Sequence, residues 1–208
     1  ISFLLQNDGY GNFTDVTDAV APELRNVGMV TDAYWEDIDA DGDLDLIISG
    51  EWMPISVFSN MLNEIEIPED RGSTFKNVTV DIGLEHTNGW WNTLEITDID
   101  EDGDLDILAG NLGLNSYLTA SKESPIKLYL NDFDQDMRAD PIIVRKVEGI
   151  EYPVALVDEL FSQMTSLRRG FTTYDEFSKY SIQELFSSIS IDSSITKAVT
   201  MFESILLE

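Results

Sequence analysis

Short apolar runs separated by polar residues dominate the first three quarters of the chain. Segments 29–35 and 46–49 are rich in β-branched and aromatic residues and are bounded by Gly or Asp, and 55–58 and 126–130 are two further apolar runs. Runs of this length and composition are typical of β-strands. The pattern predicts a mainly β protein.

A helical period replaces this pattern in residues 156–190. Four apolar residues recur there at the spacing of one helical face: Leu156, Leu160, Met164 and Leu167. Segments 173–176 and 181–184 each fit a capping box, in which a hydroxyl and a Glu bind the free amides at a helix start. We predict two or three short helices inserted between strands, with strand character returning in 198–207.

An internal repeat organises the β part of the chain. The acidic sequence Asp-Ile-Asp-Ala-Asp-Gly-Asp-Leu-Asp at 37–45 returns at 98–106 with one change, a period of 61 residues. A companion motif, Phe-Thr-Asp-Val-Thr at 13–17, matches Phe-Lys-Asn-Val-Thr at 75–79 with a period of 62. One repeat therefore holds roughly four strands, which is the size of a propeller blade.

The two ends of the chain resemble each other. Ser-Ile-Leu-Leu-Glu at 204–208 is similar to Ser-Phe-Leu-Leu-Gln at 2–6, so the chain ends at the phase of the repeat at which it began. Because the chain opens directly in an apolar run, we interpret it as a piece of a longer protein.

The acidic loops have the spacing of calcium sites. Ca²⁺ takes about six to eight oxygen ligands, and carboxylates at alternate positions of a tight loop can converge on one ion if Gly at position 6 allows the turn. The predicted side-chain ligands are Asp37, Asp39, Asp41 and Asp45 in the first loop, and Asp98, Asp100, Asp102 and Asp106 in the second. Asp43 and Asp104, at position 7, would contribute their backbone carbonyls.

A third acidic loop, 132–140, keeps the acids but not the Gly. Its predicted ligands are Asp132, Asp134, Asp136 and Asp140, with the carbonyl of Arg138. Met137 occupies position 6, where a left-handed conformation costs about 1 kcal/mol or more. This loop is either a third calcium site or an acidic β-turn with a weak ion or none.

The EF-hand is excluded as the type of loop. That motif requires a bidentate Glu at position 12 and a helix on each side. Position 12 is Ile48, Ala109 and Ile143 in the three loops, and each residue belongs to an apolar run that predicts a strand.

The charge of the chain restricts its partners. Forty acidic residues against twelve basic ones give a formal net charge of −28, which repels nucleic acid and anionic membranes. No apolar run reaches the roughly 18 residues of a membrane span, and the absence of Cys excludes a disulfide framework.

The pairing of the motif at 7–17 with the acidic loop at 37–46 resembles the FG-GAP/VCBS repeat. This repeat builds the calcium-binding β-propeller of integrin α-subunits and of secreted bacterial proteins, including relatives of cartilage acidic protein. The resemblance implies calcium in the blade loops and adhesion or ligand recognition outside the cytoplasm, whether secreted, periplasmic or at the cell surface.

The expected architecture is a partial propeller. We predict about three blades in 1–155, a helical insertion in 156–195 and a returning blade strand in 196–208. Three blades cannot close a ring, since propellers usually need at least four. Unpaired sheet edges invite pairing, so a homo-oligomer through these edges is one expectation.

Catalytic candidates are weak. His86 is the single histidine and is predicted to be a loop residue, and a glycosidase pair among Glu36, Glu51 and Glu95 is a minor alternative. The four tryptophans could form a sugar-binding platform, although packing between blades is the commoner use: Trp35, Trp52, Trp90 and Trp91. Asn12 and Asn77 match the glycosylation pattern, but their equivalent repeat positions favour a structural turn.

Two functional hypotheses follow. The first is a non-enzymatic calcium-binding module that recognises a protein or glycan, in which calcium has a structural role. The alternative is the accessory carbohydrate-binding propeller of a secreted polysaccharide-degrading enzyme.

Overall fold

The computed structural model describes residues 1–62, 74–171 and 173–208. It is mainly β, with several antiparallel sheets, none of which closes on itself in the described ranges. The chain forms two compact units, Ile1–Tyr117 together with Met201–Glu208, and Leu118–Thr200. The second unit is therefore an insertion in the sequence of the first.

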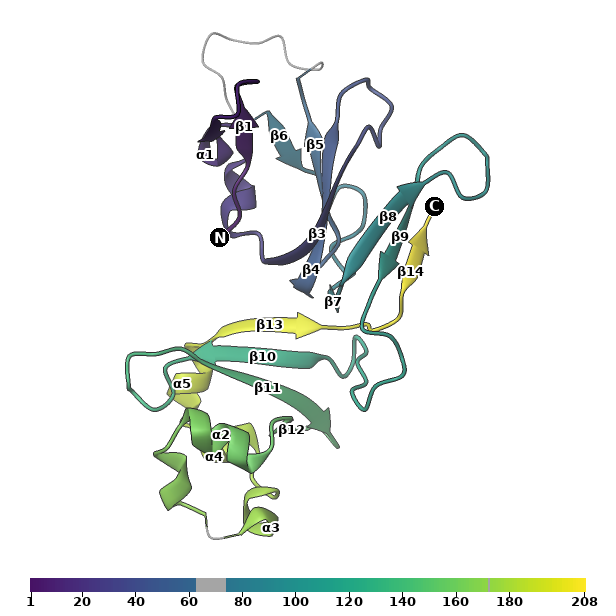
Figure 1. Cartoon of the computed structure of the whole chain (residues 1–208). Helices are drawn as coiled ribbons and strands as arrows, with labels where there is room; N and C mark the ends of the chain where they lie inside the picture. Colours follow the sequence, from purple (N-terminus) through teal and green to yellow (C-terminus); the bar gives the residue numbers. More distant parts are fainter. Residues whose placement is uncertain (63–73, 172) are drawn as a thin grey trace. The chain divides into compact units, whose positions relative to one another are not determined.

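Three sheets make up the first unit (Figure 1). The first pairs β1 (Leu5–Asn7) with β2 (Phe13–Asp15). The second has the order β3-β4-β5-β6, with β7 beside β4: β3 (Met29–Glu36), β4 (Asp45–Met53), β5 (Ser56–Asn60), β6 (Phe75–Asn77) and β7 (Gly89–Trp90). The third has the order β14-β9-β8: β8 (Thr93–Thr97), β9 (Asp106–Gly110) and β14 (Ile205–Leu207). Helix α1 (Thr17–Val20) and the 3₁₀ helix η1 (Pro22–Asn26) follow β2.

The second sheet carries apolar side chains on both faces, because successive residues of a strand point in opposite directions. Leu46 and Ile48 of β4 belong to one buried cluster, to which Leu4 and the helices after β2 also contribute. Ile47, between them, belongs to another cluster that contains residues of β8, β9 and β14. The central sheet is thus packed between the N-terminal segment and the third sheet.

Strand β14 returns the chain to the first unit after the insertion. Ile205 pairs with Ala109 and Leu207 with Ile107. The return is fixed by Gly113, whose N–H donates to Phe202 O at 2.8 Å.

The second unit combines one sheet with short helices. Its sheet has the order β12-β11-β10-β13: β10 (Ile126–Asn131), β11 (Asp140–Val147), β12 (Ile150–Pro153) and β13 (Ile195–Val199). The helices lie between β12 and β13: α2 (Val157–Gln163), the 3₁₀ helix η2 (Leu167–Arg169), α3 (Tyr174–Phe177), α4 (Ile182–Leu185) and α5 (Ser188–Asp192). Ile142, Val144, Leu160 and Met164 pack in its core.

The sequence predicted a division into 1–155, 156–195 and 196–208. The two compact units divide the chain at other points. Residues 118–155 belong with the helices, because β10 and β11 pair with each other and with β12 and β13. The returning segment is also shared, since β13 belongs to the second unit and β14 to the first.

The predicted helix starts at 173–176 and 181–184 are present. Leu156, however, which the helical spacing placed on a helix face, lies outside the helix. Thr173 Oγ1 accepts from Glu176 N at 3.2 Å, and Ser181 N donates to Glu184 Oε2 at 2.8 Å. Leu156 is 71% exposed, because it is the extended residue that precedes α2 and not part of the helix.

Candidate metal centres

Each of the three acidic loops joins two adjacent antiparallel strands. Loop 37–45 connects β3 to β4, loop 98–106 connects β8 to β9, and loop 132–140 connects β10 to β11. The first two lie in the first unit and the third in the second unit. No helix flanks any of them, as the exclusion of the EF-hand required.

The first Asp of every loop binds the same two backbone amides. Asp37 accepts from the N–H groups of residues 41 and 42 at 3.0 and 3.1 Å. Asp98 accepts from residues 102 and 103, both at 3.1 Å, and Asp132 from 136 and 137, both at 2.9 Å. This carboxylate thus holds the turn of each loop in one shape.

Two further hydrogen bonds recur at the same positions. The Asp at position 5 accepts from the N–H at position 7, at 3.0 Å for Asp41, 3.2 Å for Asp102 and 2.9 Å for Asp136. The Asp at position 9 accepts from the N–H at position 2. The distance is 3.1 Å for Asp45, 2.7 Å for Asp106 and 2.9 Å for Asp140.

The backbone of the third loop follows the other two despite its different sequence. Position 6 has a positive φ in all three, at 97° for Gly42, 101° for Gly103 and 69° for Met137. Position 4 is also left-handed in all three, at Ala40, Glu101 and Gln135. The Met137 side chain is 94% exposed, so the surface leaves room for it.

Carboxylate oxygens gather in every loop within 4.8 Å of one another. The three clusters are Asp37, Asp39 and Asp41; Asp98, Asp100 and Asp106; and Asp132, Asp134 and Asp136. Among the described residues, each of these groups could hold a metal ion. The clusters bring together nine of the predicted ligands.

Three other predicted side-chain ligands lie outside these clusters: Asp45, Asp102 and Asp140. The clusters consist of side-chain oxygens alone, so the backbone carbonyls of Asp43, Asp104 and Arg138 stay predicted ligands. Asp45 has a clear structural use, since Oδ1 accepts from Asn60 N at 2.8 Å and Oδ2 from Ile38 N at 3.1 Å. Asp140 likewise accepts from Gln163 Nε2 at 3.3 Å through its Oδ1.

Crowding and burial oppose the charged form of some of these carboxyls. Burial raises the pKa of Asp45, and the neighbouring Asp39 and Asp41 raise it further, although two backbone N–H groups act in the other direction. Burial and the charges of Asp136, Asp140 and Asp132 raise the pKa of Asp134.

The donor set fits a hard cation. Asp41 Oδ2 and Asp134 Oδ1 are buried atoms without a hydrogen-bond partner in the described part of the chain. A buried, unpaired carboxylate oxygen is costly unless a cation or a donor satisfies it. Oxygen atoms alone make up the clusters, and such ligands suit Ca²⁺, Mg²⁺ or Mn²⁺ rather than a thiolate- or imidazole-binding metal.

No family model, curated protein or solved structure matches the chain. None of the helices in the described ranges combines the length and the apolar character that a membrane crossing needs.

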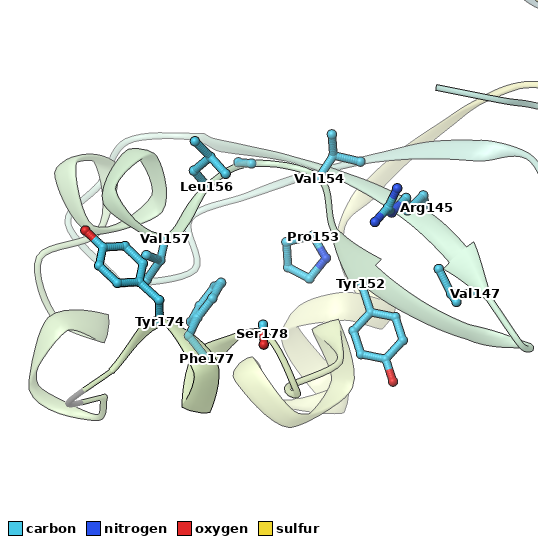
Figure 2. Close-up of a pocket in the computed structure, with 11 residues that line it drawn as sticks. Arg145, Val147, Tyr152, Pro153, Val154, Leu156, Val157, Tyr174, Phe177 and Ser178 are labelled. Atoms are coloured by element: carbon cyan, nitrogen blue, oxygen red, sulfur yellow. The ribbon is translucent and has the colours of Figure 1, made fainter. Parts of the chain in front are cut away.

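A second candidate site is an apolar recess in the second unit, of about 510 Å³. Strands β11 and β12, the connection to α2, and α3 line it (Figure 2). Pro153, Leu156 and Phe177 supply apolar surface, and Arg145 and Tyr152 supply polar groups. The sequence did not indicate this recess, since its walls come from elements that meet only in the folded chain.

The remaining candidates do not form a site. Trp91 and Trp52 are buried, and Trp35 packs edge-on against Phe75 with ring centroids 5.8 Å apart. The four tryptophans therefore do not share one exposed platform. His86 is a surface residue 3.6 Å from Glu85.

Of the other acidic and asparagine candidates, Glu95 and the two asparagines have local partners. Glu95 accepts from the Tyr34 hydroxyl at 3.3 Å, while Glu36 and Glu51 are the last residue of β3 and a residue of β4. Asn12 Nδ2 donates to Asp8, and Asn77 Oδ1 accepts from Thr79 N.

Proposed function

We propose that this chain is a non-enzymatic calcium-binding repeat module, part of a β-propeller, that serves recognition or adhesion outside the cytoplasm. One observation carries the metal-binding part: three strand-connecting loops repeat the same hydrogen bonds and each gathers carboxylate oxygens within 4.8 Å. The resemblance of the loops and of the Phe-x-Asx-Val-Thr motif to FG-GAP/VCBS repeats supports calcium as the ion and the propeller as the complete fold.

The ion would have a structural role. In each loop the three clustered carboxylates would hold it, and its charge would offset their mutual repulsion. Because each loop joins two paired strands, the bound ion would also fix the end of that hairpin. Extracellular calcium modules often bind with dissociation constants near 10⁻⁴–10⁻³ M, which suits a location outside the cytoplasm.

Thermal unfolding with and without calcium tests this proposal. The expected result is a midpoint that rises by several degrees in millimolar Ca²⁺ relative to EGTA, and less in Mg²⁺, which demands stricter geometry. An equal midpoint in calcium and in EGTA would refute the proposal.

Matched variants separate ligand loss from charge loss. The variant D39N/D100N/D134N removes one charge per loop, at a residue that belongs to the oxygen cluster in all three loops, and keeps a side-chain oxygen there. We expect it to lose most of the calcium response. The control E101Q removes a charge in the second loop, at a residue outside the oxygen clusters, and should keep the response. Isothermal titration calorimetry on the same variants counts the sites.

A carbohydrate-binding role within a larger enzyme stays the second candidate, but the four tryptophans do not share an exposed platform that would support it. A glycan array compared with protein-partner capture distinguishes the two kinds of ligand.

A further inference from the structure

The third sheet of the first unit has an open edge at β14. Its strand order is β14-β9-β8, so β9 covers one side of β14 and no strand of the described chain covers the other. The second sheet, by contrast, continues beyond its third strand β5 to a fourth strand, β6.

The pairing pattern shows which backbone groups of β14 point to the open side. In an antiparallel pair, residues that exchange hydrogen bonds alternate with residues that do not. Leu94 N–H donates to Asp32 at 2.8 Å, so it points away from its partner in β9, Ala109. Ala109 therefore directs its own N–H and C=O to Ile205 in β14. The next residue, Leu206, consequently directs both groups to the open edge.

At two equivalent positions elsewhere in the first unit, the outward backbone groups form hydrogen bonds with a Val-Thr pair. Leu4 N–H donates to Thr17 Oγ1 at 2.7 Å, and Leu4 O accepts from Val16 N at 3.0 Å. Val57 N–H donates to Thr79 Oγ1 at 3.1 Å, and Val57 O accepts from Val78 N at 2.9 Å. In both cases a Val-Thr pair binds the backbone N–H and C=O of one residue, Leu4 just before β1 and Val57 in β5.

Leu206 is the third member of this set. Val57 pairs with Ile47 and Leu206 with Leu108, and Ile47 and Leu108 are separated by the 61-residue period of the repeat. The sequence match between 204–208 and 2–6 aligns Leu206 with Leu4 independently. Register and sequence thus agree.

We propose that the open edge of β14 binds an extended peptide strand containing Asx-Val-Thr, as β5 binds β6. The Val N–H of this strand would donate to Leu206 O, and the Thr hydroxyl would accept from Leu206 N–H. Lys76, the residue before Asn77 in β6, faces Ser59 of β5. Because Leu206 corresponds to Val57, Glu208 corresponds to Ser59, and the residue before Asx would face Glu208. A Lys there would form an opposite-charge pair with Glu208, which favours a basic residue at that position. The β14 edge contains no residue of the metal loops.

Amide exchange of the full chain tests the proposal with a synthetic peptide of residues 74–84, Thr-Phe-Lys-Asn-Val-Thr-Val-Asp-Ile-Gly-Leu. The expected result is that the Leu206 amide exchanges about tenfold more slowly at saturating peptide. The amides of Ile205 and Leu207, which already face β9, should change little. A peptide with Thr79→Val lacks the hydroxyl and should protect Leu206 far less.

The variant L206P removes the outward donor. Because that N–H faces away from β9, Pro costs no bond of the β9–β14 pair, as is usual for Pro in an edge strand. We expect it to fold and to lose peptide binding. Unchanged Leu206 exchange at millimolar peptide, or equal protection by the Thr79→Val peptide, would overturn the proposal even if L206P proved unstable.

Discussion

Leu94 N–H donates a hydrogen bond of 2.8 Å to Asp32 Oδ2, from one sheet of the first unit to another. The Thr93 hydroxyl donates to the same oxygen at 3.0 Å. Asp32 belongs to β3 and Leu94 to β8, so one carboxylate ties the second sheet to the third. The bond from Leu94 lowers the pKa of Asp32, although burial of the group acts against it.

The substitution D32A should destabilise the first unit by about 1–2 kcal/mol, because it leaves the Leu94 amide without its acceptor. D32N keeps an oxygen and should cost less. Since the folded-state pKa of Asp32 is lowered, its stabilisation is present above pH 3.8 and is lost as the pH falls through the lowered pKa. Urea unfolding at pH 7 and pH 3 measures both effects, and an unchanged D32A midpoint at pH 7 would contradict the first.

Asp15 should titrate with a pKa of about 2. The Thr17 hydroxyl contributes most to this lowering, and Arg25 Nη1, 2.9 Å from Asp15 Oδ2, adds to it. R25A should move the pKa toward 3.8, whereas R25K, which keeps a positive charge, should move it less. Carboxyl chemical shifts between pH 1.5 and 6 report the titration, and an ordinary value in the parent chain would show that these bonds are absent in solution.

Met137→Gly should stabilise the second unit. Met137 has a left-handed backbone that costs a residue with a Cβ about 1–2 kcal/mol. The greater freedom of Gly in the unfolded chain offsets part of this, so we expect a net gain of roughly 0.5–1 kcal/mol. The converse change, G103A, should destabilise the corresponding loop of the first unit. Denaturant unfolding compares them, and a loss of stability in M137G would argue against the left-handed turn.

Glu151 is the centre of a polar contact in the second unit. It lies 2.6 Å from Lys127 Nζ and accepts from the Tyr129 hydroxyl at 2.8 Å. Burial by itself raises the pKa of Glu151, but these two partners outweigh burial, and the net shift is downward.

E151Q should therefore cost about 1–2 kcal/mol at neutral pH, because it leaves a partly buried Lys127 without its counter-charge. The stabilisation should be present above pH 4.5 and disappear as the pH falls through the lowered pKa. The double-mutant cycle of E151Q with Y129F measures the share of the hydroxyl. If E151Q unfolds at the same denaturant concentration as the parent chain at pH 7, the contact does not contribute to stability.

The local features of the fold were predictable because their causes are local. Alternating carboxylates and a Gly at position 6 identify the loops, and hydroxyl–Glu spacing identifies the starts of α3 and α4. Even the third loop, in which Met137 breaks the pattern, keeps the turn because Asp132 binds the two amides that define it.

The division into units was not predictable in the same way. Strands β9 and β10 have similar apolar runs, but β9 pairs with β8 and β14 while β10 pairs with β11 and β13. Such partners are chosen by contacts between distant parts of the chain. For the same reason the hydrogen bond from Leu94 to Asp32, 62 residues away, carried no signal in the sequence.

The position of β14 has a consequence for synthesis on the ribosome. The β8–β9 pair is synthesised before the second unit, but the third strand of its sheet, β14, follows roughly ninety residues later, after that whole unit. At ~5–20 residues per second, the ribosome would take on the order of 5–20 s to supply it. Throughout that interval the side of β9 that will pair with β14 has unpaired backbone groups. The speed at which the inserted unit is translated and folds therefore sets how long chaperones and neighbouring chains can bind this edge.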